Sequence, residues 1–182
     1  MSLFASLIRK LQQLFKPEFA AGAHAEQIFE ELCCERNYTC MRIEQDRASY
    51  RKWYARQTNF GKRGDYLIRG FNVEIEVKCR TAYGREEYQY LSLKEIKAHR
   101  RNQQQVKNPV VFAFFVRKGR RAVKESLRMI ALDDLTPPLK PRILQTKSGN
   151  ALRIPRSAMV NGFDLLEKVL SEQSASSISQ RR

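Results

Sequence analysis

Residues 64–80 read GDYLIRGFNVEIEVKCR, and this stretch holds two short runs that are typical of β-strands. The runs cover residues 65–69 and 72–80, with Gly70 and Phe71 between them. Glycine at the first of two central turn positions is typical of a type II′ turn. The stretch therefore predicts a tight antiparallel β-hairpin.

The hairpin determines which side chains face one another. With a two-residue turn, Asp65 is expected directly opposite Glu76, where Cβ atoms lie about 4.5 to 5.5 Å apart. Alternation along the second strand places Glu74 and Lys78 on the same face as Glu76, and the apolar residues between them on the other face. The pattern thus brings carboxylates and an ammonium group together on one face.

These residue types point to a metal and to hydrolysis. Carboxylates opposite each other repel unless a cation lies between them, and their oxygens suit Mg²⁺, with Mn²⁺ as a substitute. Lys78 is placed to position or deprotonate a metal-associated water, or to stabilise charge on a phosphate under attack. Asp65, Glu76 and Lys78 therefore favour metal-assisted phosphodiester hydrolysis. A solvated hairpin face is the alternative interpretation.

The charge of the chain suggests its partner. The sequence has 182 residues and a net charge of +15, of which residues 51–128 carry +13. A basic stretch interleaved with aromatic residues suits a nucleic acid, so we expect DNA, duplex or branched; a basic solvated surface or an anionic lipid stays open. The contacts expected are Arg51, Lys52, Trp53, Arg56, Lys62, Arg63, Arg80, Arg100 and Arg101.

The order Gly64-Asp65, hairpin, Glu76-Val77-Lys78 resembles the PD-(D/E)xK nuclease superfamily, with glycine in place of the motif's proline. Upstream, Gly22-x-x-x-Glu26 is similar to the helix-borne glutamate of archaeal Holliday-junction resolvase-like members. The resemblance covers about residues 20–118. It implies an α/β, restriction-endonuclease-like fold, in which a central mixed β-sheet is flanked by helices.

The resemblance also implies roles for single residues. Asp65, Glu76 and the backbone carbonyl of Val77 would bind the metal, Lys78 would act on the water, and Glu26 would be an auxiliary catalytic ligand. It implies a Mg²⁺-dependent DNA endonuclease, structure-specific or part of a homodimer or larger DNA-processing assembly. Three alternatives stay open: a catalytically silent nucleic-acid-binding module, a subunit active only inside an assembly, and a membrane-surface or partner-binding adaptor using residues 1–16.

Three segments are expected along the chain. They are an amphipathic helix over 1–17, the nuclease domain over 18–170 and a disordered tail over 171–182. Within the domain, helices are expected over about 21–36, 92–107 and 163–170, and further strands over about 38–44, 110–116, 127–132, 142–147 and 151–154.

Other motifs concern a helix start, zinc binding and the location of the protein. Ser92 and Glu95 predict a capping box at a helix start, and His99 on that helix is expected to face solvent or a phosphate. The cysteines and histidines lack the spacing of a zinc site. The sequence contains neither a run of about 18 apolar residues nor a signal-peptide pattern, so a cytoplasmic, nucleoid-associated protein is expected and a membrane partner is not.

Overall fold

The structure is a computed structural model, and it describes residues 17–43, 61–82, 87–135, 142–146 and 149–179. Its strands are β1 (Cys40–Arg42), β2 (Tyr66–Ile68), β3 (Val73–Arg80), β4 (Gln89–Ser92), β5 (Val110–Lys118), β6 (Arg121–Ala131), β7 (Arg142–Thr146), β8 (Gly149–Ile154) and β9 (Val160–Asn161). Its helices are α2 (Pro17–Glu35), α4 (Leu93–Val106) and α5 (Asp164–Ser179), with short 3₁₀ turns at Asp133–Leu135 and Arg156–Ala158.

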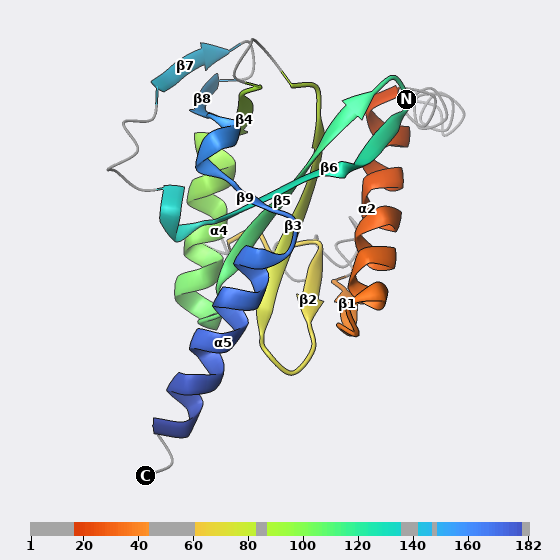
Figure 1. Cartoon of the computed structure of the whole chain (residues 1–182). Coiled ribbons are helices and arrows are strands. Elements are labelled where there is room, and N and C mark those ends of the chain that lie inside the picture. The colour runs from red at the N-terminus through yellow and green to blue at the C-terminus, as the bar shows by residue number, and fades with distance from the viewer. Residues whose placement is uncertain (1–16, 44–60, 83–86, 136–141, 147–148, 180–182) are drawn as a thin grey trace, which may run out of the picture.

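A mixed β-sheet forms the centre of the molecule (Figure 1). Its six strands run in the order β1-β2-β3-β5-β6-β9, in which β3 and β5 are parallel and the other neighbours antiparallel. A second, three-stranded antiparallel sheet has the order β4-β8-β7. The expected fold class, a central mixed sheet flanked by helices, is confirmed.

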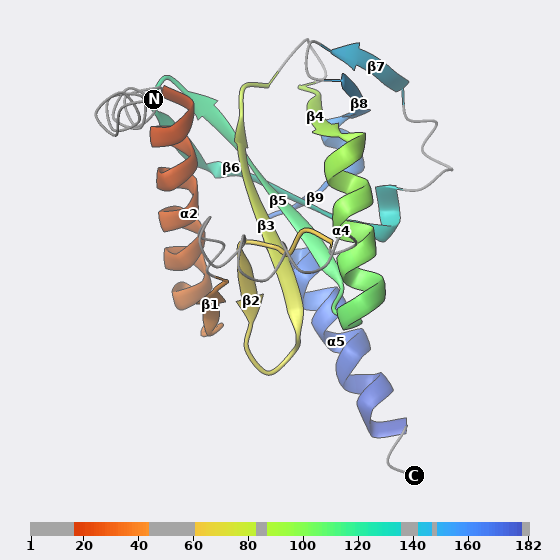
Figure 2. The same cartoon turned by 180° about the vertical axis from the view of Figure 1, so that it is seen from behind.

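The two faces of the central sheet are covered by different elements. One hydrophobic cluster joins α2 and α5 to alternate residues of β3 and β5, such as Ile75 and Val111. The other cluster joins α4 and the small sheet to the intervening residues of β5, such as Phe112 and Phe114. Figure 2 shows α2 and α4 on opposite sides of β3 and β5. The first six residues of β5 are therefore buried, alternately against one and the other of two separate layers.

Helix α2 forms because its small and apolar residues recur on one face. Its buried residues are Ala21, Ala25, Ile28, Phe29 and Cys33. The helix begins four residues earlier than predicted, at Pro17, because proline is well suited to the first helical position. It ends at Glu35, one residue before the predicted end, and Asn37 just after it has a φ of 60°, the left-handed conformation that terminates helices.

The β2–β3 pairing has the register predicted from the sequence. The partners are Tyr66 with Ile75, Leu67 with Glu74, and Ile68 with Val73. The two-residue turn is wrong, because residues 69–72 all leave the ladder. Gly70 and Asn72 adopt positive φ values of 87° and 57°, which glycine and asparagine tolerate better than other residues. The longer loop leaves the register unchanged.

The other predicted elements differ mainly in length. Helix α4 lies where it was expected, whereas β5 and β6 are longer than predicted. Helix α5 continues to Ser179, through most of the stretch 171–182 that was expected to be disordered. Residues 1–16 of the helix expected over 1–17 lie outside the described residues, and Pro17 begins α2. Within the described part of the chain, no helix combines the length and apolarity needed to span a membrane.

Candidate active site

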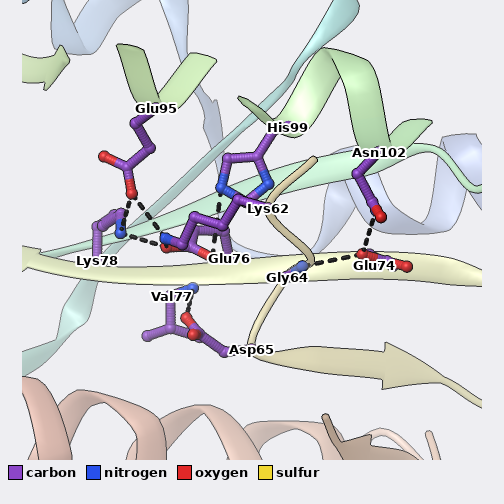
Figure 3. A network of polar contacts seen from close by, with 10 residues as sticks. All are labelled: Lys62, Gly64, Asp65, Glu74, Glu76, Val77, Lys78, Glu95, His99 and Asn102. Carbon is purple, nitrogen blue, oxygen red and sulfur yellow. Dashed lines mark hydrogen bonds and ion pairs between the residues drawn. The ribbon is translucent and has the colours of Figure 1, made fainter. Parts of the chain in front are cut away.

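Strand β3 carries the expected polar residues on one face. Val73, Ile75 and Val77 pack in the core beneath α2, whereas Glu76 and Lys78 point toward α4 (Figure 3). The solvated-face alternative is wrong, because Glu74 and Glu76 are only 0% and 1% exposed. Two buried carboxylates require specific partners, since burying an uncompensated charge is costly.

Residues 61–64 form the cover over this face. A Cβ atom on Gly61 would lie 2.1 Å from the backbone nitrogen of Asn102, so only glycine fits against α4 here. The next backbone N–H, of Lys62, donates to the carbonyl of Ala98 at 2.9 Å. Gly64 also has no room for a side chain, because its Cβ would lie 2.8 Å from the carbonyl oxygen of Ile75. These close approaches fix Lys62 above β3.

Glu74 is fully satisfied by hydrogen bonds. Its Oε1 accepts from Arg63 at 2.8 and 3.0 Å and from Asn108 at 3.4 Å. Its Oε2 accepts from the backbone N–H of Gly64 at 2.9 Å and from Asn102 at 3.0 Å. This carboxylate therefore ties the cover segment to α4 and β3.

Glu76 belongs to a second network, which is only partly satisfied. Its Oε1 forms ion pairs with Lys62 and Lys78. Glu95 on α4 binds the same two ammonium groups, each at 2.7 Å. The Oε2 of Glu76 lies 3.5 Å from Nε2 of His99 and has no hydrogen-bond partner among the described residues. Two carboxylates, two ammonium groups and an imidazole thus meet in one buried cluster.

The network changes the proton affinities of its members. Burial alone would raise the pKa of Glu95, but Lys78 and Lys62 outweigh it and lower that pKa to about 2. Burial would lower the pKa of Lys62, yet Glu76 and Glu95 raise it well above its usual range. Burial, reinforced by Lys62, lowers the pKa of His99 to about 3. At neutral pH, the imidazole is therefore uncharged beside charged neighbours.

Asp65 lies immediately before β2, and Figure 3 shows it on the other side of β3 from His99. Its Oδ2 accepts from the backbone N–H of Val77 at 2.8 Å. Burial and then the negative charge of Glu76 raise the pKa of Asp65 to about 6. The negative charges of the two carboxylates therefore repel each other. The expectation that both lie on one face of the hairpin is wrong, because Asp65 precedes the β2–β3 ladder and lies on the other side of β3 from the Glu76 network.

Glu26 lies on α2 and forms an ion pair with Arg42 of β1. Its side chain is 29% exposed. The structure thus places the expected auxiliary ligand outside the Glu76 network, in a pair that a metal would have to replace.

The expected DNA contacts fall into three groups. Arg51, Lys52, Trp53 and Arg56 lie outside the described residues. Lys62 and Arg63 are engaged by the two buried carboxylates. Arg80, Arg100 and Arg101 lie at or near the surface, and Arg80 lines a cavity of about 520 Å³ that also includes Glu95, Gln89, Arg117 and Asn150.

The sequence patterns did not identify Glu95 and His99 as members of the network. Glu95 was assigned to a capping box, but within the described residues the Ser92 side chain makes no capping hydrogen bond and Glu95 binds the lysines instead. The expectation that His99 faces solvent is wrong, because it is fully buried against Phe112. The spacing of Glu95, His99 and Asn102 along one helix face was the available signal.

Comparisons with known proteins concern the fold. No protein-family model matches the sequence, and neither does any curated protein. Among solved structures, the chain is similar to Hjc, a Holliday junction resolvase from Archaeoglobus fulgidus, with 11% identity and a TM-score of 0.46 over 77% of this chain and 95% of that chain. It is also similar to a nuclease from a fusselovirus, with 13% identity and a TM-score of 0.49 over 88% and 92%. We therefore base the function proposed below on the residues of the site.

Proposed function

We propose that the protein is a metal-dependent DNA nuclease that hydrolyses phosphodiester bonds. The observation that carries the proposal is the arrangement of the buried Glu76 with the partly buried Asp65 and Lys78, around the start of β2 and the middle of β3. Burial of acidic side chains beside a lysine costs folding free energy, so such a cluster is more typical of a functional site than of a stabilising one.

The acidic residues fit a divalent cation. Within the described residues, Oε2 of Glu76 is buried without a hydrogen-bond partner, and the charge of Glu76 helps to raise the pKa of Asp65. A bound cation would relieve both conditions. Asp65, Glu76 and the backbone carbonyl of Val77 would hold Mg²⁺ or Mn²⁺, with Glu26 as an auxiliary ligand. When bound, the cation would polarise the scissile phosphate and lower the pKa of a water molecule.

Lys78 supplies the other chemical group. Its side chain is 11% exposed, and Glu76 and Glu95 fix its ammonium group. An ammonium group held in this way can orient an attacking water and stabilise the charge that develops on the phosphate oxygens. Because its partners are already in place, little reorganisation is needed during the reaction.

DNA, duplex or branched, is the proposed substrate. The support is the net +13 of residues 51–128, together with the exposed Arg80, which lines the same cavity as Glu95. Phosphate contacts of this kind hold the backbone without selecting a sequence. A homodimer or larger assembly in the cytoplasm, near the nucleoid, remains part of this proposal.

The test is a cleavage assay with the full chain and labelled linear, branched and single-stranded DNA. We expect cleavage with Mg²⁺ or Mn²⁺, none with a chelator, and none for Asp65→Asn. Asp164→Asn, an exposed aspartate on α5, is the matched control and should cleave like the parent. DNA binding without metal-dependent cleavage by the parent protein would contradict the proposal and favour a silent binding module.

A further inference from the structure

A second group of potential metal ligands lies on the α4 side of β3. Glu76, Glu95 and His99 each offer one ligand atom, and these atoms all lie within 4.8 Å of one another. Asp65 is not a member of this group, and Figure 3 shows it on the other side of the strand. The group therefore differs in position and in chemistry from the Asp65 side of the site, because it includes an imidazole.

The unsatisfied atoms of the cluster face one another. His99 is 0% exposed, and in the described part of the chain neither of its ring nitrogens has a hydrogen-bond partner. The same is true of Oε2 of Glu76, which lies 3.5 Å from Nε2 of His99. Buried polar atoms without partners are rare in folded proteins, so these atoms require an explanation.

The spacing suits a metal ion. Two donors that lie about 2.1 Å from one ion and 3.5 Å from each other subtend a near-tetrahedral angle at the ion. An imidazole nitrogen with carboxylate oxygens favours a first-row transition metal over Mg²⁺. A bound ion would also satisfy two of the three unpartnered atoms of the described cluster at once, Oε2 of Glu76 and one ring nitrogen of His99.

We propose that Glu76, Glu95 and His99 form a second divalent-metal site, which takes Mn²⁺ or a similar transition metal through one nitrogen ligand. The inference deepens the proposed function and rests on it in part, because Glu76 would be shared with the ion held by Asp65. It adds a ligand, His99, from a helix that carries no part of the recognised motif.

Lys62 would compete with a metal ion for this site. Its ammonium group binds the same two carboxylates that the ion would need. The side chain of Lys62 is 28% exposed and comes from a segment without regular structure, whereas Lys78 is 11% exposed and comes from β3. An entering divalent ion would therefore displace Lys62 rather than Lys78. The released ammonium group would then be available to a DNA phosphate.

The experiment measures Mn²⁺ binding to the full chain. Calorimetry counts the bound ions, and pulsed electron paramagnetic resonance detects a nitrogen ligand. We expect two ions per parent chain, one of them with nitrogen coupling. His99→Phe, which keeps a ring against Phe112, should bind one ion without that coupling. The sequence contains only one other histidine, so His24→Gln is the matched control and should retain the coupling. Absence of coupling in the parent, or its persistence in His99→Phe, would overturn the inference.

Two more variants keep the test decisive if His99→Phe does not fold. Glu95→Gln should weaken the nitrogen-coupled ion by about tenfold to a hundredfold, and unchanged affinity would contradict the site. Lys62→Met should instead strengthen it by about tenfold or more, because a competing positive charge is removed. Weaker or unchanged binding of the nitrogen-coupled ion in Lys62→Met would contradict the displacement of Lys62 by the ion.

The result separates this inference from the proposed function. Asp65→Asn should retain the nitrogen-coupled ion and lose cleavage. If cleavage depends on Asp65 but the parent binds a single ion without nitrogen coupling, the second site is wrong and the nuclease proposal stands. If the coupled ion is present but the parent does not cleave DNA with Mg²⁺ or Mn²⁺, the nuclease proposal fails and the metal site stands.

Discussion

Glu74 and Glu76 lie two residues apart on β3, face the same helix and are equally buried, yet their surroundings differ. Glu74 accepts hydrogen bonds at both oxygens from Arg63, Gly64 and two asparagines. Glu76 has two ammonium groups at one oxygen and, within the described residues, no hydrogen bond at the other. A carboxylate with a complete set of donors serves structure, whereas one left incomplete is available for a ligand.

The largest expected effect is on cleavage by Glu76→Gln. Removing the charge of this proposed metal ligand should lower cleavage by about a thousandfold or more, which corresponds to destabilising the transition state by at least about 4 kcal/mol. Steady-state rates with labelled DNA and Mg²⁺ measure this loss. Thermal unfolding of the same variant should show a protein that is still folded. A cleavage rate close to that of the parent would place Glu76 with Glu74 among the structural residues.

Lys78→Ala should reduce cleavage by about a hundredfold to a thousandfold, the usual cost of losing one transition-state stabilising donor. DNA affinity should stay near that of the parent, because the role proposed for Lys78 is exerted mainly in the transition state. Filter binding beside the cleavage assay separates the two quantities. Lys97→Ala, an exposed lysine on α4, is the control. Equal losses of binding and cleavage in Lys78→Ala would make Lys78 a phosphate anchor.

Glu74→Ala should destabilise the folded protein. It leaves Arg63 and the buried N–H groups of Gly64 and Asn102 without their acceptor, which should lower the free energy of unfolding by about 3 kcal/mol. Denaturant unfolding measures the change. The control is Glu125→Ala on the exposed side of β6, which should change stability by less than about 0.5 kcal/mol. A stable Glu74→Ala protein that no longer cleaves DNA would reverse the roles of the two glutamates.

Asp65→Asn should stabilise the metal-free protein at neutral pH. Because the pKa of Asp65 is about 6 in the fold against an ordinary value of 3.8, the parent should lose stability as pH rises from about 4 to about 6. The asparagine side chain cannot ionise, so the variant does not lose stability over this range. It should be more stable than the parent by about 1 to 3 kcal/mol above pH 6, and equal to the parent below pH 4. Unfolding across this pH range tests the sign. A variant less stable at pH 8 would show that the Asp65 charge is favourably paired.

The smallest effect should come from Ser92→Ala. A helix-capping serine is usually worth about 1 kcal/mol, but the Ser92 side chain makes no capping bond within the described residues, so the loss should be below about 0.5 kcal/mol. Thermal unfolding of Ser92→Ala is the measurement. If the free energy of unfolding falls by about 1 kcal/mol or more, Ser92 does cap the helix. Glu95 would then belong to a capping box and not to the cluster with the lysines.

Local patterns predicted the hairpin register and the partition of β3 into two faces. They did not predict that the polar face is buried, because its cover comes from residues 61–64 and α4, which lie elsewhere in the sequence. A stripe of polar residues such as Glu95 and His99 predicts solvent exposure by composition alone. Only the crossover from β3 through α4 to the parallel strand β5 turns that stripe toward the sheet.

The polar residues of α4 that face β3 also restrict the position of the helix along that strand. A slide of one turn along β3, about 5.4 Å, would move Asn102 away from Glu74 and Glu95 away from the two lysines. Apolar packing tolerates such slips far better than buried charges do, because a carboxylate left without its partners costs several kcal/mol. The groups proposed to cut DNA thereby also select a single alignment of helix and sheet.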